Sequence, residues 1–349
     1  MLAGRVQKII LTQPSLHGWA ARTAAASAGS AASGAAGFTS APAPQPDLRQ
    51  AFSYCVNQVK QHDYENYLWV TQLPKELRAP IFALRAFNVE TALIGEHARS
   101  EMLVLMRCQW WRDAINDCYK GSPPAQPVIT ALAAVLQQRP LTRYRLQQMV
   151  STREADLLSA EQPASLAALE QYAEGTAGQL LALQLEAAGI SQSSSSSSSE
   201  GGSGAGTAAA EHAAAHLGKA VGLAGLLRGT YAHAAQRRVY LPADVCAAHG
   251  VAAEDVLAGR DSPGMRDAVL AVAAAAKQHL DAAAQLLRDA PPAARPLFAP
   301  GVATRMYLAA LVKAGFNLFE PTMLRKGSAV PPLTYQLRLK WAQLRNTGF

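Results

Sequence analysis

The spacing of apolar residues along the chain predicts helices from residue 47 onward. In the segments 47–74 and 75–98, apolar side chains recur at intervals of three and four, which places them on one face of a helix; in the first segment the helix is followed by a short aromatic stretch that ends at Pro74. These side chains are Phe52, Cys55, Val56 and Val59 in the first segment, and Ile81, Leu84, Phe87 and Thr91 in the second. Residues 100–121 form a third helical segment, which Gly121 and two following prolines bring to an end.

The rest of the chain has the same helical character. Further helices are predicted over 127–138, 141–158, 164–188, 209–236, 265–289, 302–317 and 333–346. Proline-rich breaks separate the last of them, at 291–300 and 330–332. Ala, Leu, Gln, Glu and Arg are abundant and β-branched residues are sparse, which favours helix over strand. The sequence therefore predicts an all-α bundle with short loops.

Two segments differ in composition from this helical body. Residues 1–46 contain Arg5, Lys8 and Arg22 but no acidic residue, and they become rich in Ala, Ser, Gly and Pro, as is typical of an organellar transit peptide. We expect a mitochondrial rather than a plastid leader; a disordered tail would have this composition too, but would not explain the absence of acids before Asp47. Residues 191–208 are a Ser/Gly run, which we expect to be a disordered insertion without function of its own in the helical domain 47–349.

Charge and cysteine content exclude several classes of function. The formal net charge is +7, but without the first 46 residues the chain has 29 basic and 25 acidic residues, and we expect no Lys/Arg cluster interleaved with exposed aromatics. Nucleic acid is therefore not an expected partner.

No stretch has the roughly 18 uninterrupted apolar residues that a membrane-spanning helix needs, so any membrane contact would be peripheral. The four cysteines show no CxxC spacing and are expected to be free thiols: Cys55, Cys108, Cys118 and Cys246.

Six segments, in a fixed order, carry a resemblance to a known family. They are "IFALRAFNVETA", "MRCQWWRDAINDCYKGSPPAQPV", "READL", "LEQYAEGTAGQLLAL", "LGKAVGLAGLLRG" and "RRVYLPADV". Together they resemble the squalene/phytoene synthase family over roughly residues 50–320. The resemblance implies an isoprenoid-synthase-type helical bundle around a central cavity. In active members, two Asp-rich motifs face each other across that cavity and hold Mg²⁺, which binds the substrate diphosphate and helps it leave.

The positions that the resemblance assigns to these motifs have lost their carboxylates. The first motif corresponds to Asn88 and Ala92, and the second corresponds to Gly229 and His233. An amide oxygen is a weak ligand for Mg²⁺, a methyl group and a glycine offer none, and an imidazole suits zinc or copper better. The resemblance therefore predicts a pseudoenzyme with two degenerate motifs, no catalytic residue, no bound metal and no cofactor.

Some details resemble one branch of the family in particular. These are "FALRAFNVE", "QWWRDAI" and "RRVYLPADVCAAHGV", behind a leader of mitochondrial type. That branch is regarded as non-catalytic and acts in early assembly of the membrane arm of respiratory complex I. It implies a protein on the matrix side of the inner mitochondrial membrane, in peripheral contact with it, whose partners are membrane-arm subunits or other assembly factors.

A second interpretation stays open, in which the chain is an active or ligand-binding prenyl-diphosphate transferase. It requires oxygen ligands from elsewhere, and Asp113, Asp117, Asp156 and Glu154 are the acids most easily imagined in that role, although their spacing does not support it. His212 and His216 have the i, i+4 spacing of a two-histidine metal site, but no third ligand is visible, which favours ordinary packing.

Several cationic and aromatic residues are candidates for lining the cavity. An anionic lipid, a prenyl diphosphate or an acidic peptide could be bound there by Arg85, Arg112, Arg228, Arg237, Arg238 and Tyr240. In the alternative interpretation, which we favour, Arg237 and Arg238 are solvated and the other arginines are structural ion-pair partners. Trp110 and Trp111 could form the floor of an apolar cavity, but core packing is the expectation for both.

Overall fold

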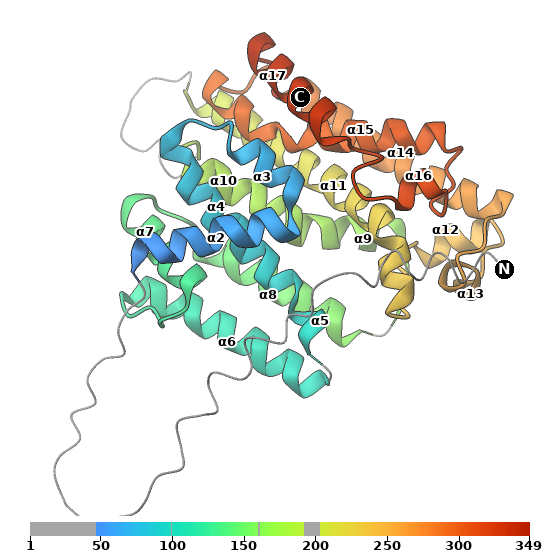
Figure 1. Ribbon diagram of the computed structural model, residues 1–349, viewed down its shortest axis with the longest axis horizontal. Helices are drawn as coiled ribbons and strands as arrows, with labels where there is room; N and C mark the ends of the chain where they lie inside the picture. Colours follow the sequence, from blue (N-terminus) through green and yellow to red (C-terminus); the bar gives the residue numbers. More distant parts are fainter. Residues whose placement is uncertain (1–46, 99, 160, 192–202) are drawn as a thin grey trace, which may run out of the picture. The chain divides into compact units, whose positions relative to one another are not determined.

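The computed structural model describes residues 47–98, 100–159, 161–191 and 203–349, and in these ranges it contains helices and no strand (Figure 1). The predicted leader 1–46 and most of the Ser/Gly run lie outside the described residues. The prediction of an all-α bundle is confirmed. In the described ranges up to residue 191, the helical elements are α2 (Leu48–His62), α3 (Tyr64–Val70), α4 (Lys75–Ala92), α5 (Ile94–His97), α6 (Glu101–Lys120), α7 (Pro127–Gln138), α8 (Arg143–Leu158), α9 (Leu166–Ala173), the π-helix η1 (Glu174–Gly178) and α10 (Gln179–Ala187). They are followed by α11 (Ser203–Ala235), α12 (Ala243–Ala248), α13 (Ala253–Leu257), α14 (Pro263–Leu286), the 3₁₀-helix η3 (Pro292–Phe298), α15 (Pro300–Lys313), α16 (Pro321–Leu324) and α17 (Pro332–Arg345).

Capping residues mark several helix boundaries in the structure, and the predicted end at Gly121 is among them. Asp47 begins α2, because its side chain accepts a hydrogen bond from the backbone amide of Arg49 at 3.1 Å. Gly121 ends α6 in the left-handed conformation, with a φ of 80°, which glycine adopts without strain. The segment 127–138 has the predicted bounds. Short helices without a long apolar repeat, such as α12 and α13, were not predicted.

The predicted helix 164–188 is divided by the π-helix η1, at the point where α11 crosses it. Two glycines of α11 allow the helices to approach closely. A Cβ atom on Gly218 would lie 2.4 Å from the Cα of Gly178, and one on Gly222 would lie 2.4 Å from the Cβ of Ala173. Single π-helical turns inside α-helices frequently accompany functional sites, and this one lies next to the polar cluster described below.

The prediction that residues 191–208 form a loop is wrong from residue 203 onward, because α11 begins there. Gly206 in this segment allows the helix to pack against the residues that follow α14. A Cβ atom on Gly206 would lie 3.4 Å from both the carbonyl oxygen of Asp289 and the Cδ of Pro291. The proline-rich break after residue 291 is itself the 3₁₀-helix η3.

The core lies between two groups of helices. The long helix α11 packs against α14, α15, α9 and α10, while α4 packs against α2, α7, α8 and α10 (Figure 1). The largest fully buried side chains include Trp69, Phe87 and Tyr335, and the indole nitrogen of Trp69 donates a hydrogen bond to the carbonyl oxygen of Pro296 at 2.8 Å. All four cysteines are free thiols, as predicted. None of the helices in the described ranges is both long and apolar enough to cross a membrane.

Candidate functional site

The first predicted motif position, Asn88, is bound by a buried arginine. The Oδ1 atom of Asn88 accepts a hydrogen bond from the Nη2 of Arg153 on α8 at 2.6 Å. Arg153 also donates to the hydroxyl oxygen of Thr91, which in turn donates to the carbonyl oxygen of Phe87 at 2.7 Å. Arg153 is only 6% exposed, so its guanidinium charge is placed inside the protein next to the motif. Ala92, the other position of this motif, is exposed at the end of α4.

Asp156, three residues after Arg153 on α8, connects this region to the second motif. It accepts hydrogen bonds from the Tyr240 hydroxyl at 2.7 Å and from Arg238 at 3.0 Å, and its own carbonyl oxygen accepts another from Arg238 at 2.7 Å. Burial raises the pKa of Asp156, although both partners stabilise its charged form. Tyr172 on α9 hydrogen-bonds to Arg153, and its ring centroid lies 6.2 Å from that of Tyr240.

His233, in the second predicted motif, packs its ring against Tyr240. The ring centroids are 4.6 Å apart in an edge-to-face arrangement, and the Nδ1 atom of His233 is buried without a hydrogen-bond partner. Burial, together with the nearby charge of Arg238, lowers the pKa of His233 to about 4, so the imidazole is neutral at pH 7. The ring also occupies the space beside Gly229, where a Cβ atom would lie 2.5 Å from its Cε1.

These contacts form one continuous arrangement, which we call the central polar network. Its members are Asn88, Thr91, Arg153, Asp156, Tyr172, His233, Arg238 and Tyr240. It links α4 to the end of α11 through the side chains of α8 and the segment after α11. Asn88 of the first predicted motif and His233 of the second are thus brought into one site, which is filled by interacting protein groups, whereas Ala92 lies outside it.

Three of the other candidate arginines also have carboxylate partners. Ion pairs join Arg85 to Asp63, Arg112 to Glu154 and Arg228 to Glu65, at 3.2, 2.5 and 2.7 Å respectively. Arg85 is buried and lies over the ring of Trp69 at 5.5 Å, and burial lowers its pKa. Arg237 is exposed, with a left-handed φ of 57°. A ligand anion would have to compete with these carboxylates for the arginines. Binding of an anion by the arginines stays a prediction.

Comparisons with known proteins identify the family. A model of squalene/phytoene synthases matches residues 59–341. The chain is 37% identical over 282 residues to "NADH dehydrogenase (ubiquinone) complex I, assembly factor 6" of Bos taurus, covering 81% of this chain and 80% of that protein. It is 35% identical over 300 residues to the Drosophila melanogaster homolog of that factor, with 84% and 83% covered. The chain belongs to the squalene/phytoene synthase family.

A solved structure in the same family shows the fold independently. A dehydrosqualene synthase, crystallised in complex with a ligand, superimposes with a TM-score of 0.70 and covers 85% of this chain and 98% of its own, at 19% sequence identity. The isoprenoid-synthase fold predicted from the sequence is confirmed. At this identity the likeness concerns the fold alone.

The residues at the predicted motif positions do not fit the Mg²⁺ that the family resemblance implies. The amide oxygen of Asn88 already accepts from a guanidinium, whose positive charge would repel a cation at the same place. Ala92 and Gly229 have no ligand atom, and the imidazole of His233 is packed against an aromatic ring. Asp156 is the carboxylate of the network, and its side-chain oxygens already accept hydrogen bonds from Arg238 and Tyr240. Across the described ranges, no group of three or more His, Cys, Asp or Glu side chains is arranged to hold a metal ion.

The other acids considered from the sequence lie apart from the network. Asp113 and Asp117 are on α6, where Asp113 accepts from Gln109 at 2.9 Å and Asp117 pairs with Lys120 at 3.3 Å. Glu154 is the partner of Arg112.

The two histidines with metal-site spacing on α11 have different surroundings. His212 is exposed, whereas the Nδ1 of His216 lies 2.8 Å from the Nδ1 of His279 on α14. The Nε2 of His279 in turn lies 3.3 Å from Glu170. Burial lowers the pKa of His216, so these contacts favour packing, as expected from the sequence.

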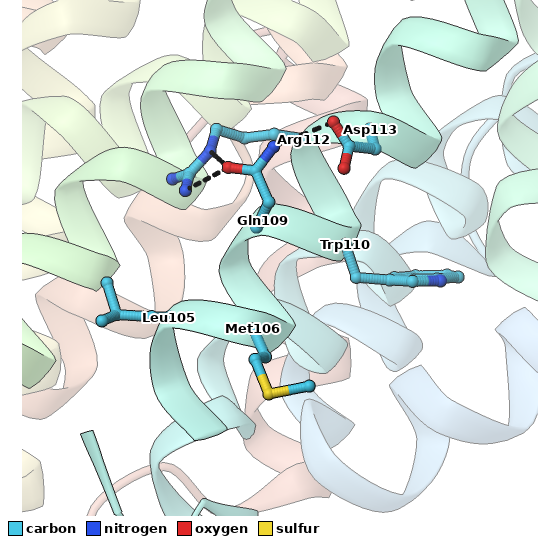
Figure 2. Close-up of a pocket in the computed structure, with 6 residues that line it drawn as sticks. All are labelled: Leu105, Met106, Gln109, Trp110, Arg112 and Asp113. Carbon is cyan, nitrogen blue, oxygen red and sulfur yellow. Dashed lines mark hydrogen bonds between the residues drawn. The ribbon is translucent and has the colours of Figure 1, made fainter. Parts of the chain in front are cut away.

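The prediction of core packing is right for Trp111 and wrong for Trp110. Trp111 is 5% exposed and packs edge-on against Phe87 at 5.4 Å, while Trp110 is 42% exposed. A shallow hollow of about 460 Å³ lies on α6 and is lined by Trp110, Met106 and Arg112, among others. Figure 2 shows these side chains projecting from the helix. Apolar residues occur on both faces of this helix, so the sequence pattern alone does not distinguish the buried tryptophan from the exposed one.

Proposed function

We propose that this protein assists the assembly of mitochondrial NADH dehydrogenase, complex I. The observation that carries the proposal is the 37% identity to the bovine assembly factor 6 over four fifths of both chains. The family model, which matches residues 59–341, spans the positions of every member of the central polar network. The names of the relatives in Homo sapiens and Mus musculus state the same role.

The second part of the proposal is that the bundle works without prenyl-transfer chemistry. Protein groups satisfy one another where the family resemblance predicts two Mg²⁺-binding motifs: Arg153 binds Asn88, and the ring of His233 fills the space beside Gly229. Prenyl-diphosphate transfer would need carboxylates free to bind Mg²⁺ at this place. The alternative, an active transferase, draws its support from the 29% identity to a phytoene synthase of Thermus thermophilus.

The place of action and the partners belong to the same proposal. The protein acts in mitochondria on the matrix side of the inner membrane, to which residues 1–46 direct it as a transit peptide. It contacts newly inserted membrane-arm subunits of complex I or other assembly factors, and it contacts the membrane surface peripherally.

The experiment is complementation of cells in which the gene for this chain is disrupted, with assembled complex I measured on native gels. The wild-type chain should restore the complex. His233→Ala, at an equal protein level, should also restore it, because the imidazole has no chemical role in the proposal. His212→Ala, an exposed histidine on the same helix, is the matched control.

Two results would contradict the proposal in different ways. Normal complex I in the disrupted cells would remove the assembly function. Failure of an abundant, folded His233→Ala protein, beside a functional His212→Ala protein, would show that the central polar network has an active role in place of a structural one.

A further inference from the structure

The C-terminal helix α17 has an exposed apolar face. Its outward side chains form the α17 stripe, which consists of Leu333, Leu337, Trp341 and Leu344. These four side chains are 72%, 64%, 57% and 81% exposed, respectively. Exposed apolar residues are ordinary when they are scattered singly, but four on one face of one helix indicate an interaction surface.

The orientation of α17 is fixed, so the stripe cannot rotate into the core. Tyr335, Leu339 and Ala342 are buried, and the helix packs against α15 and α3. At about 100° per residue, the stripe occupies an arc of about 80° on the side opposite to these three residues. The chain end is also held, because Arg305 lies 5.2 Å over the ring of Phe349. Figure 1 shows α17 at the upper edge of the helical unit, with α15 beneath it.

The charges around the α17 stripe are all positive. On the helical wheel, Lys340 flanks one edge of the stripe, and Arg338 and Arg345 flank the other. The guanidinium of Arg345 lies 4.3 Å over the ring of Trp341. After Glu320 the sequence has five cationic residues and no acidic one.

The acids nearest to α17 do not offset this charge on its outer face. Asp63 and Glu65 influence the buried Tyr335 and therefore lie on the inner side of the helix. Each is already in an ion pair, with Arg85 and Arg228 respectively. The outer face thus combines leucines, a tryptophan and unopposed cations, which is the pattern of a helix that lies in the interface of an anionic membrane.

A second exposed apolar face, on α6, lacks this charge pattern. Met102 and Met106 are 65% and 60% exposed there, but the same helix also has acidic residues, Glu101, Asp113 and Asp117 among them. Charges of both signs give this face no preference for an anionic surface. It therefore provides a control of matched exposure.

We propose that the α17 stripe inserts shallowly into the surface of an anionic phospholipid membrane, with Arg338, Lys340 and Arg345 at the headgroups. This identifies the site of the membrane contact in the proposed function and rests on that function for its cellular setting. The binding itself is a property of the purified chain and is tested without complex I.

The experiment is flotation of the full-length chain with vesicles of phosphatidylcholine, with and without added cardiolipin. The wild-type protein should bind only the cardiolipin vesicles. The double variant Leu337→Gln with Trp341→Gln should bind at least roughly tenfold more weakly, since two of the four inserting side chains are lost. Arg338→Gln with Lys340→Gln should weaken binding by roughly tenfold as well. Met102→Gln with Met106→Gln should bind like the wild type.

All substituted side chains are exposed, so circular dichroism should show unchanged helix content and melting in each variant. Equal flotation of wild-type and α17 variants would overturn the proposal, because other residues, such as the basic segment 1–46, would then carry the binding. No flotation of the wild type, combined with a dimer that the Leu337→Gln and Trp341→Gln variant loses, would assign the stripe to a second copy of the chain. Either result leaves the complex I proposal to its own complementation test.

Discussion

The effect on stability of a side chain at position 229 depends on the ring of His233, and a double-mutant cycle can measure this dependence. In the wild-type chain, a Cβ atom added at Gly229 would lie 2.5 Å from the Cε1 of His233, where about 3.5–4.0 Å is the favourable distance between carbons. The ring must therefore move by about 1 Å against Tyr240, an overpacking that costs about 1–3 kcal/mol. Alanine in a helix interior is favoured over glycine by about 1 kcal/mol. Gly229→Ala should thus lower the free energy of unfolding by up to about 2 kcal/mol.

The sign of the effect should reverse when the ring is removed. In a His233→Ala background the space beside residue 229 is free, so Gly229→Ala should raise the free energy of unfolding by about 1 kcal/mol. The coupling between the two sites is then about 1–3 kcal/mol, measured by urea denaturation followed by circular dichroism. Gly225→Ala on the same helix is the control, because a Cβ atom there meets nothing within 4 Å. It should stabilise both backgrounds equally. A Gly229→Ala variant as stable as Gly225→Ala in the wild type would refute this reasoning.

Three further predictions concern the stability of the bundle. The pKa of His233 is about 4 in the folded state and about 6.5 unfolded, so the unfolded chain binds more protons between these values. The free energy of unfolding should fall by up to about 3 kcal/mol as the pH decreases from about 6.5 to about 4. In urea titrations, His233→Gln should remove this part of the pH dependence and His212→Gln should not. An equal dependence of the free energy of unfolding on pH in the His233→Gln variant and the wild type would contradict the prediction. Trp111→Ala should lower the free energy of unfolding by about 3–5 kcal/mol, whereas Trp110→Ala should change the melting temperature little. If Trp110→Ala were the more destabilising of the two, the assigned burial would be disproved. Arg153→Met should lower the free energy of unfolding by about 1–3 kcal/mol, because it leaves buried hydrogen-bond acceptors on α4 unpaired. A urea denaturation curve superimposable on that of the wild type would show that these hydrogen bonds contribute nothing to stability.

The helices were predictable because their signals are local. Apolar spacing and the Gly121 terminus act within a few residues, and they identify α2, α4 and α6. The start of α11 was missed because its Gly and Ala residues are helical through close packing on a distant segment, near Pro291. Composition alone makes such a segment resemble a flexible loop.

The candidate site was predictable only in part. Motif spacing identified Asn88 and His233, but Arg153 lies 65 residues from Asn88 in sequence, and its contact with that residue depends on how α8 packs on α4. Tyr172 reaches the network from α9, immediately before the π-helix. An arginine within a helix is ordinarily a surface residue, so no local signal marks Arg153 as buried.

The central claim is that this chain keeps the isoprenoid-synthase fold without its metal and diphosphate chemistry. The most direct test is to measure binding and turnover of farnesyl and geranylgeranyl diphosphate by the purified protein, with and without Mg²⁺. The account predicts no Mg²⁺-dependent binding and no condensed prenyl product. Product formation that requires Mg²⁺ and is lost in Asp156→Asn would contradict it, because the network carboxylate would then be a metal ligand.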